Sequence, residues 1–283
     1  MHSFKRIALI MVMACSFVNT TRAFQLDLPM LPSTNHDGFV VIAHRGGSAY
    51  SPENTMSAFR KAVSMKAEMI ELDVLLSKDG VPVVIHDATV DRTTNTKGTV
   101  SDFTLAELRK MDAGSWFDEK FKGEKIPTLE EVLQFAKDKI AVNIEIKTEA
   151  VTDSVKNGIV EKCLKIVGKA GVKNQVIFSS FDYRALNHLE ELAPEMPKAM
   201  LYEKSQSGEK LPSELVQEYH VNAFNCSHKQ LSDEWIADLK KNNIPFFIYT
   251  VNDRDLMGSL IKKGATGIFS DKPDVLKEVV ENL

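Results

Sequence analysis

Cysteine is scarce in this chain of 283 residues, which carries only three. Three cysteines are too few for the disulfide framework that holds many small secreted domains. We interpret Cys163 and Cys226 as two unrelated buried thiols, with a pairing between them as the alternative. The fold must therefore rest on an apolar core, and a chain of this length with 43% apolar residues can form a single large one.

Long apolar runs are also missing beyond the amino terminus, where no stretch offers the ~18 unbroken apolar residues of a membrane span. Residues 1–23 differ, because Lys5 and Arg6 precede an apolar run over 7–18 and the segment ends in the small residue Ala23. This pattern predicts a cleaved secretory signal peptide and export across the inner membrane to the periplasm. A buried first helix or a short anchor is the alternative.

A lipoprotein form is a further alternative for the amino terminus. Cys15 follows Val12-Met13-Ala14, which resembles a lipoprotein cleavage box, and Cys15 would then carry the lipid. The bulky Met13 fits such a box poorly, so we favour the signal peptide without lipidation.

An excess of positive charge is absent as well. Removing residues 1–23 takes away three of the 35 basic side chains and no acid, which leaves 32 basic against 39 acidic side chains, a net charge of −7. An acidic protein lacks the excess of basic side chains that is typical of proteins that bind nucleic acid or adhere to an anionic membrane. An anionic substrate would have to be held by local charges or by a metal.

Short β-type runs alternate with helical patterns from residue 39 to the end. Residues 24–38 lack periodicity and contain proline and glycine, so we interpret them as a linker to one domain over 39–283. The β-type runs cover residues 39–44, 68–76, 81–87, 140–147, 175–181, 198–203, 221–226, 245–251 and 265–270. Strands that alternate with helices predict repeated βα units and a parallel sheet.

Nine runs are one too many for an eight-stranded barrel. The runs 68–76 and 81–87 are joined by only Ser-Lys-Asp-Gly, whereas parallel neighbours need a crossover of about a dozen residues. An Asp-Gly connection instead predicts a hairpin. We therefore predict an α/β fold, a distorted (β/α)8 TIM barrel in which 81–87 returns as a β-hairpin arm.

The longest interval without a strand pattern is 88–139, which we predict to be a small insertion folded over the mouth of the barrel. Two capping boxes, Thr104 with Glu107 and Thr128 with Glu131, predict short helices within it. The insertion could serve as a substrate lid or as a stabilising element, and the sequence favours neither.

Three acids point to a metal site. Glu71 and Asp73 are two positions apart on a predicted strand, so both side chains face the barrel interior. Glu145 lies on the run 140–147 and is also predicted to face inward. Three inward carboxylates form a hard, oxygen-rich site for one divalent cation, Ca²⁺ or Mg²⁺. A structural network in which Glu145 pairs with Lys147 is the alternative.

Two histidines end their β-type runs, where barrel active sites form. The Asp-Gly turn places Asp73 roughly opposite His86, while His44 ends the first run. Near a divalent metal, this pair could add metal ligands or act as an acid and a base across a phosphorus. Arg45 offers a planar fork for phosphate oxygens, and Lys147 offers a point charge.

Several ordered motifs together resemble the glycerophosphodiester phosphodiesterase family, over about residues 39–274. They are His44-Arg45-Gly46, Pro52-Glu53-Asn54-Thr55, Glu71-Leu72-Asp73-Val74, the run from Asp79 to Asp87, Glu145-Ile146-Lys147, Thr250-Val251-Asn252 and Ser270-Asp271-Lys272-Pro273. Tyr249 stands where many members carry Trp, and Ser270 where Thr is common, so the lining of the alcohol pocket is expected to differ.

The resemblance implies hydrolysis of a small-molecule glycerophosphodiester to sn-glycerol 3-phosphate and an alcohol, through a cyclic phosphate formed by the substrate's own hydroxyl. It implies a distorted TIM barrel in which His44 and His86 act as general base and acid. It also implies a divalent cation on Glu71, Asp73 and Glu145. Phosphate contacts from Arg45 and Lys147 complete the implied site. Nothing in the pattern indicates an oligomeric state.

Two other functions fit parts of the pattern. A lipid phosphodiesterase of the phospholipase C or D type would need an apolar rim, for which Trp116, Phe117 and Phe121 are candidates, although the acidic net charge weighs against it. A secreted protein that binds glycerophosphodiesters without cleaving them would be expected to have lost a histidine or an acid. This chain retains both histidines and all three acids.

Overall fold

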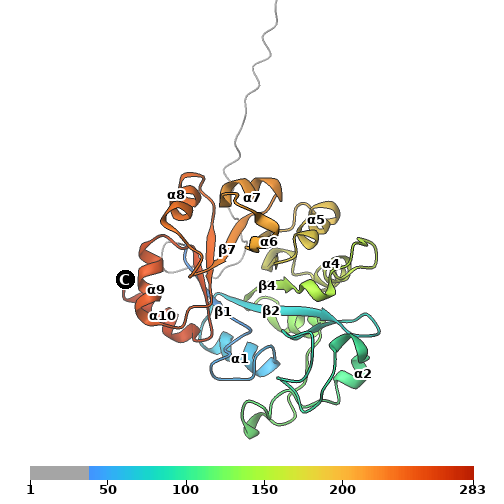
Figure 1. The fold of residues 1–283 in the computed structure, drawn as a ribbon. Helices are drawn as coiled ribbons and strands as arrows, with labels where there is room; N and C mark the ends of the chain where they lie inside the picture. The colour runs from blue at the N-terminus through green and yellow to red at the C-terminus, as the bar shows by residue number, and fades with distance from the viewer. Residues whose placement is uncertain (1–37) are drawn as a thin grey trace, which may run out of the picture.

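The computed structural model describes residues 38–283 (Figure 1). The predicted signal peptide, Cys15 and all of the predicted linker except Gly38 lie outside the described residues. Within them, eight parallel strands close into a barrel with helices between, which confirms the predicted fold. Hydrogen bonds join neighbouring strands in the order β1-β2-β4-β5-β6-β7-β8-β9 and close the ring between β9 and β1.

The strands coincide closely with the predicted β-type runs. They are β1 (Val40–Ala43), β2 (Met69–Leu76), β3 (Pro82–Val84), β4 (Ala141–Ile146), β5 (Val176–Ser180), β6 (Lys198–Leu201), β7 (Ala223–Ser227), β8 (Phe246–Tyr249) and β9 (Gly267–Ser270). Each strand is short and largely buried, because the barrel core covers its inner face and the helices cover its outer face.

The helices form a ring outside the barrel (Figure 1). They are α1 (Met56–Ser64), α2 (Leu105–Leu108), α3 (Leu129–Ala136), α4 (Ile159–Ala170), α5 (Tyr183–Leu192), α6 (Lys204–Ser207), α7 (Pro212–Glu218), α8 (Asp233–Lys241), α9 (Arg254–Lys262) and α10 (Pro273–Glu281). Both predicted capping boxes are present, at the starts of α2 and α3. No helix within residues 38–283 is long and apolar enough to cross a membrane.

The barrel interior changes from apolar at one end to polar at the other. Its apolar layers consist of Val40, Ile42, Met69, Ala141, Ile177, Ala199, Ala223, Phe247 and Phe269. Further along the same strands, inward positions carry Glu71, Asn143 and Ser179, and the Ser179 hydroxyl donates to Asn143 Oδ1 at 2.8 Å. The polar layer lies toward the carboxyl ends of the strands, where TIM barrels form their active sites.

The predicted hairpin is present, with a different register. Strand β3 runs antiparallel to β2, and the Ile85 amide donates to the Asp73 carbonyl at 3.0 Å, so Asp73 faces Ile85 rather than His86. The prediction assumed a two-residue Asp-Gly turn. Instead Ser77 pairs with Val81 around a three-residue loop, in which Gly80 adopts a φ of +76°. The extra loop residue moves the register by one position.

The insertion is shorter than predicted. Helix α3 is the crossover between the hairpin and β4, and it packs in the helix ring beside α4, so only residues 88–128 lie outside the repeating βα units. This segment contains two 3₁₀ turns, η1 (Val100–Asp102) and η2 (Glu119–Phe121), and the short helix α2. It reaches the polar end of the barrel, because Thr93 and Ala113 border a small recess together with His86.

Cys163 in α4 and Cys226 in β7 are buried and do not pair with each other, as predicted. Burial raises the pKa of both thiols to about 12. They are therefore neutral, apolar packing groups at physiological pH.

Candidate active site

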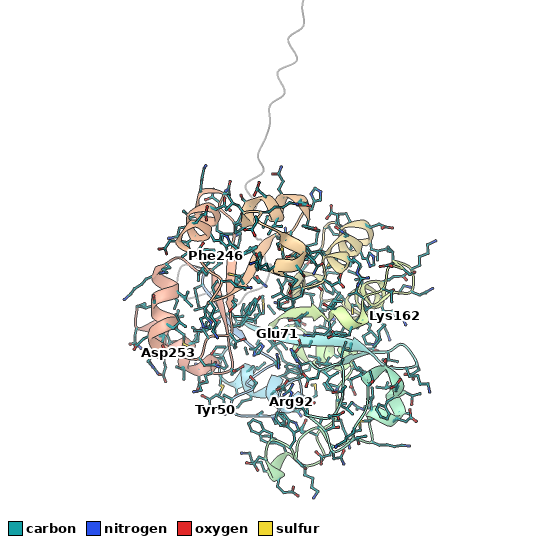
Figure 2. The ribbon with its side chains drawn as sticks, viewed as in Figure 1. Tyr50, Glu71, Arg92, Lys162, Phe246 and Asp253 are labelled. Atoms are coloured by element: carbon teal, nitrogen blue, oxygen red, sulfur yellow. The ribbon has the colours of Figure 1, made fainter. Side chains whose placement is uncertain are left out.

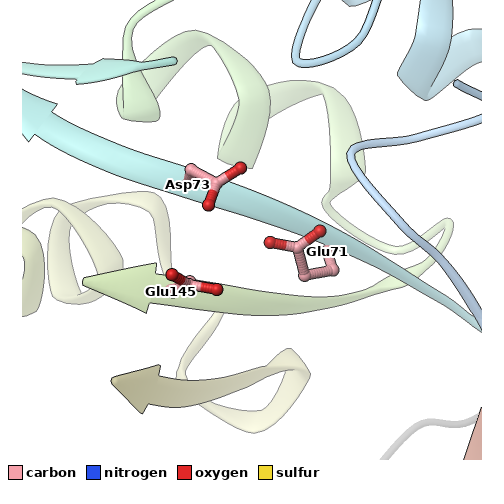
Figure 3. Close-up of side chains that lie close together, drawn as sticks. All are labelled: Glu71, Asp73 and Glu145. Carbon is pink, nitrogen blue, oxygen red and sulfur yellow. The ribbon is translucent and has the colours of Figure 1, made fainter. Parts of the chain in front are cut away.

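Three buried carboxylates from neighbouring strands meet at the polar end of the barrel. Figure 3 shows Glu71 and Asp73 on β2 and Glu145 on the adjacent β4. One oxygen from each lies within 4.8 Å of the others. The exposed fraction is 3% for Glu71 and 1% for Asp73, so water does not screen the mutual repulsion. The β-register fixes this proximity, because Asp73 and Glu145 are direct cross-strand neighbours.

The pKa values of these acids shift in opposite directions. Burial raises the pKa of Glu71 well above the ordinary value, and the nearby charges of Asp73 and Glu145 raise it further. Burial and the Asp73 charge also raise the pKa of Glu145 to about 7. For Asp73 burial acts in the same direction, but the positive charges of Lys147 and Arg45 outweigh it and lower the pKa. Full ionisation of all three acids would therefore place more negative charge in the cluster than its surroundings neutralise.

The residues present fit a divalent cation. Asp73 Oδ1 is buried and accepts no hydrogen bond within the described chain, and its nearest cation, Lys147 Nζ, is 3.4 Å away. Lys147 Nζ also lies 2.8 Å from Glu145 Oε1, which is the structural pair considered above. Lys147 and Arg45 supply two positive charges against three carboxylates. An oxygen-only set with an unpaired buried oxygen suits Ca²⁺ or Mg²⁺.

Arg45 lies in a loop that is tied tightly to β2. Its backbone N–H donates to Glu71 Oε2 at 2.8 Å, and Arg45 itself adopts a φ of +53°. Gly46 follows with a φ of +85°, and a Cβ atom there would lie 2.6 Å from the Ala58 carbonyl carbon. Asn54 closes the loop, because its side chain donates to Asp73 Oδ2 at 2.8 Å. The loop thus orients two of the acids.

Helix α1, which follows this loop, is capped by Thr55. The Thr55 hydroxyl accepts from the Ala58 amide at 3.3 Å and donates to the Pro52 carbonyl. The helix start is thereby fixed directly behind Asn54.

His44 follows β1 and is held by Asp271, which follows β9. The distance from His44 Nδ1 to Asp271 Oδ1 is 2.7 Å. The Ser48 hydroxyl and the Asn252 amide also donate to this carboxylate. Burial alone would raise the pKa of Asp271, but the hydrogen bonds from His44, Asn252 and Ser48 lower it to about 2. A charged Asp271 can only accept, so Nδ1 of His44 carries the hydrogen and Nε2 is left free.

His86 follows β3 and shows the same arrangement. Its Nδ1 lies 2.7 Å from Asp87 Oδ1, which leaves Nε2 as the free ring nitrogen. Burial lowers the pKa of His86 below its ordinary value, and the nearby Asp73 and Asp87 charges only partly offset this. The imidazole is therefore mostly neutral at physiological pH.

A cavity of about 210 Å³ joins these groups. Its lining residues are His44, Arg45, Glu71, His86, Glu145, Ser179, Phe181, Leu201, Tyr249, Thr250 and Phe269. The structure thus brings five of the seven predicted site residues to one cavity wall. Asp73 lies buried behind that wall, and the Lys147 ammonium contacts the acids instead of lining the cavity. The aromatic side of the cavity includes Tyr249, the position where the family pattern predicted a difference.

Sequence reasoning assigned no role to Asp271 and Asp87, which orient the two histidines. Asp87 is the last residue of the run 81–87 and Asp271 directly follows the run 265–270, so both lie at a strand end, which is the signal that singled out His44 and His86. Asp87 is adjacent to His86 in sequence, so it could have been found. Asp271 is 227 residues from His44, and only closure of the barrel between β9 and β1 brings them together.

The chain is similar in sequence to known proteins of one family. The sequence pattern of the Glycerophosphoryl diester phosphodiesterase family matches residues 44–275. A protein named glycerophosphodiester phosphodiesterase from Caldanaerobacter subterraneus is 43% identical over 242 residues, which is 85% of this chain and 97% of the relative. A Bacillus subtilis protein of the same name is 36% identical over 259 residues, which is 86% of this chain and 87% of the relative.

Solved structures resemble the fold closely. An Oleispira antarctica phosphodiesterase, solved with the product sn-glycerol-3-phosphate, has a TM-score of 0.78 and 28% identity, covering 85% of this chain and 96% of that one. A glycerophosphodiester phosphodiesterase from Agrobacterium tumefaciens has a TM-score of 0.74 and 30% identity, covering 85% of this chain and 99% of that one.

Cation binding by the three acids should depend on pH. Because the pKa of Glu145 is about 7, acidification protonates a group that must be charged to hold a cation. We expect the affinity of chelator-treated protein for Ca²⁺ or Mg²⁺ to fall below about pH 7, by up to about tenfold per pH unit for each competing proton on Glu145 or Glu71. Isothermal titration calorimetry at several pH values measures this affinity.

Glu145→Gln should bind the cation weakly, and its affinity should depend less on pH. Glu119→Gln, at an exposed position, should behave like the wild type. An affinity that stays constant from pH 8 to pH 5.5 would contradict the assignment.

Proposed function

Because this chain belongs to the glycerophosphoryl diester phosphodiesterase family, we propose that it hydrolyses glycerophosphodiesters to sn-glycerol 3-phosphate and an alcohol. The observation that carries the proposal is the single cavity that joins His44 and His86 to the buried cluster of Glu71, Asp73 and Glu145. Relatives named for this activity and a similar structure solved with sn-glycerol-3-phosphate support the same substrate class.

We propose that Glu71, Asp73 and Glu145 hold one divalent cation, Ca²⁺ or Mg²⁺. A cation bound there would neutralise charge on the phosphate and polarise its oxygens as a Lewis acid. Arg45 lines the same cavity and presents a planar guanidinium suited to phosphate oxygens. Lys147 holds two of the acids in place and adds positive potential beside the phosphate.

The two histidines are proposed to move protons at their free Nε2 atoms. His44 takes the proton from the attacking glycerol hydroxyl, and Asp271 stabilises the imidazolium that forms. The bond between phosphorus and the alcohol oxygen then breaks, and His86 gives that oxygen a proton. A lowered pKa reduces the protonated fraction of His86 but makes its imidazolium a stronger acid. When water opens the cyclic phosphate, the two histidines exchange roles.

A lipid phosphodiesterase on the same barrel is the second candidate, favoured by one observation. Trp116 is 38% exposed on the insertion and stacks edge-to-face with Phe117, which contacts Phe121. Such a cluster could enter a bilayer surface, yet the site cavity holds only about 210 Å³ and the chain is acidic. Both features favour a small polar substrate.

The proposed activity is tested by chelation followed by cation add-back. Protein treated with chelator should release no sn-glycerol 3-phosphate from glycerophosphocholine or glycerophosphoethanolamine, and Ca²⁺ or Mg²⁺ should restore release. Vesicles of intact phosphatidylcholine should not be cleaved under the same conditions. Cleavage of the vesicles alone would support the lipid phosphodiesterase. Cation-dependent binding of glycerophosphocholine without product would support the non-catalytic binding protein.

The histidine roles are tested by substitution. His44→Ala and His86→Ala should each lower kcat by about 10²-fold or more, as the loss of a general acid or base does. Circular dichroism and the thermal midpoint should stay near wild type, because both rings lie at the cavity edge. His220→Asn is the control, since His220 is exposed, has a φ of +50° that asparagine tolerates, and does not line the cavity. A variant of His44 or His86 that keeps nearly the full rate would show that its assigned role is wrong.

A further inference from the structure

Arg92, on the insertion after the hairpin, binds two carboxylates at once. Its Nε donates to Asp87 Oδ2 at 2.7 Å and its Nη2 lies 3.1 Å from Asp87 Oδ1. On the other side, Nη1 donates to Glu53 Oε2 and Nη2 to Glu53 Oε1, both at 2.8 Å. Figure 2 shows Arg92 toward the insertion side of the barrel, with Glu71 nearer its centre. Four of the five N–H donors of the guanidinium are thus used in these two pairs.

Each of these carboxylates holds a residue of the cavity wall. Asp87 Oδ1 lies 2.7 Å from His86 Nδ1, and Glu53 Oε1 accepts from Arg45 Nη1 at 2.8 Å. The Arg92 hydrogen bonds, followed by His86, keep the pKa of Asp87 well below its usual range. Arg92 is therefore linked through Asp87 to His86, a proposed proton-transfer group. It is also linked through Glu53 to Arg45, a proposed phosphate contact.

An ordinary surface ion pair would not be expected to hold active-site groups in place, because most such pairs contribute little to stability. The Arg92 side chain is 44% exposed, but Glu53 is only 13% exposed and Asp87 28%. Arg109, in the same insertion, offers a comparison. It is 38% exposed, makes a bidentate pair with one carboxylate, Glu131 at the capping box of α3, and also donates to the Ile126 carbonyl at 3.1 Å. Arg109 binds one structural carboxylate, whereas Arg92 bridges two carboxylates that contact the site.

We propose that Arg92 is a positioning residue that orients His86 through Asp87 and Arg45 through Glu53. This inference rests on the proposed function, since it assigns those two side chains their tasks. A fixed Asp87 accepts the Nδ1 hydrogen of His86 and keeps Nε2 available to substrate. A fixed Glu53 restrains the guanidinium of Arg45, which borders the cavity. The insertion is then part of the active site, rather than a stabilising element alone.

If Arg92 bridges the two carboxylates, its removal should lower activity, and a lysine in its place should not restore that activity. Arg92→Ala should lower kcat by about 10- to 100-fold, because displacement of a reacting group by about 1 Å has effects of this size. KM should rise as well, since Arg45 loses its restraint. Arg92→Lys should lose nearly as much, because an ammonium cannot bind both carboxylates bidentately. Arg109→Ala is the matched control, which should keep kcat and KM while lowering the thermal midpoint at least as much.

Two further measurements separate positioning from folding. Guanidinium at tens of millimolar should partly restore kcat in Arg92→Ala, whose vacated site is exposed, and should have no such effect on Arg109→Ala or Arg92→Lys. In ¹⁵N spectra of histidine-labelled protein, His86 should show a fixed Nδ1–H tautomer in the wild type and a mixture in Arg92→Ala. The spectra need no catalytic activity, so they test the inference even if the wild type proves inactive on glycerophosphodiesters.

Several results would overturn the inference. Near-wild-type kcat in Arg92→Ala or Arg92→Lys would show that the bridge is not required. A fall in kcat that only follows the folded fraction would reduce Arg92 to a structural role. An unchanged His86 tautomer in Arg92→Ala would show that Asp87 orients the ring without its help.

Discussion

The burial of three like charges inside one barrel is the constraint on which the site depends. Glu71, Asp73 and Glu145 project from adjacent strands into the largely buried polar end of the barrel, where the cost of unpaired charge is high. Lys147 and Arg45 offset part of this charge, and a buried Asp73 oxygen still accepts no hydrogen bond in the described chain. The cluster is a poor stabilising network, because a structural pair would leave no oxygen unmatched, and its oxygen ligands fit the proposed cation.

The two proposed proton-transfer groups are oriented by the same kind of contact. His44 and His86 follow strands, and each uses Nδ1 to contact a carboxylate that other side chains fix in place. Asp271 is fixed by two side chains from the loops that follow β1 and β8, whereas Asp87 is fixed by Arg92 from the insertion. The barrel supplies rigid strand ends, and the loops supply the groups that orient the rings.

The sequence predicted the fold well because its main evidence is local. Alternating β-type runs and helical patterns indicate a barrel, and a four-residue connection is too short for a parallel crossover. The register of the hairpin between β2 and β3 was harder to predict, because one extra loop residue at Lys78 changed the partner of Asp73. The roles of Asp271 and Arg92 depend on contacts made only after the chain folds, so no spacing rule reveals them. The boundary of the insertion was misplaced because the helix at its end looks, in sequence, like the helices within it.

The proposed cation site is tested most directly by a crystal structure grown with Mn²⁺ and sn-glycerol 3-phosphate, with anomalous scattering used to locate the metal. We expect one anomalous peak bound by an oxygen from each of Glu71, Asp73 and Glu145, with the product phosphate beside it and Lys147 moved away from Asp73. A map without a peak among these acids, in which Lys147 still pairs with Glu145 while product fills the cavity, would contradict the proposed site.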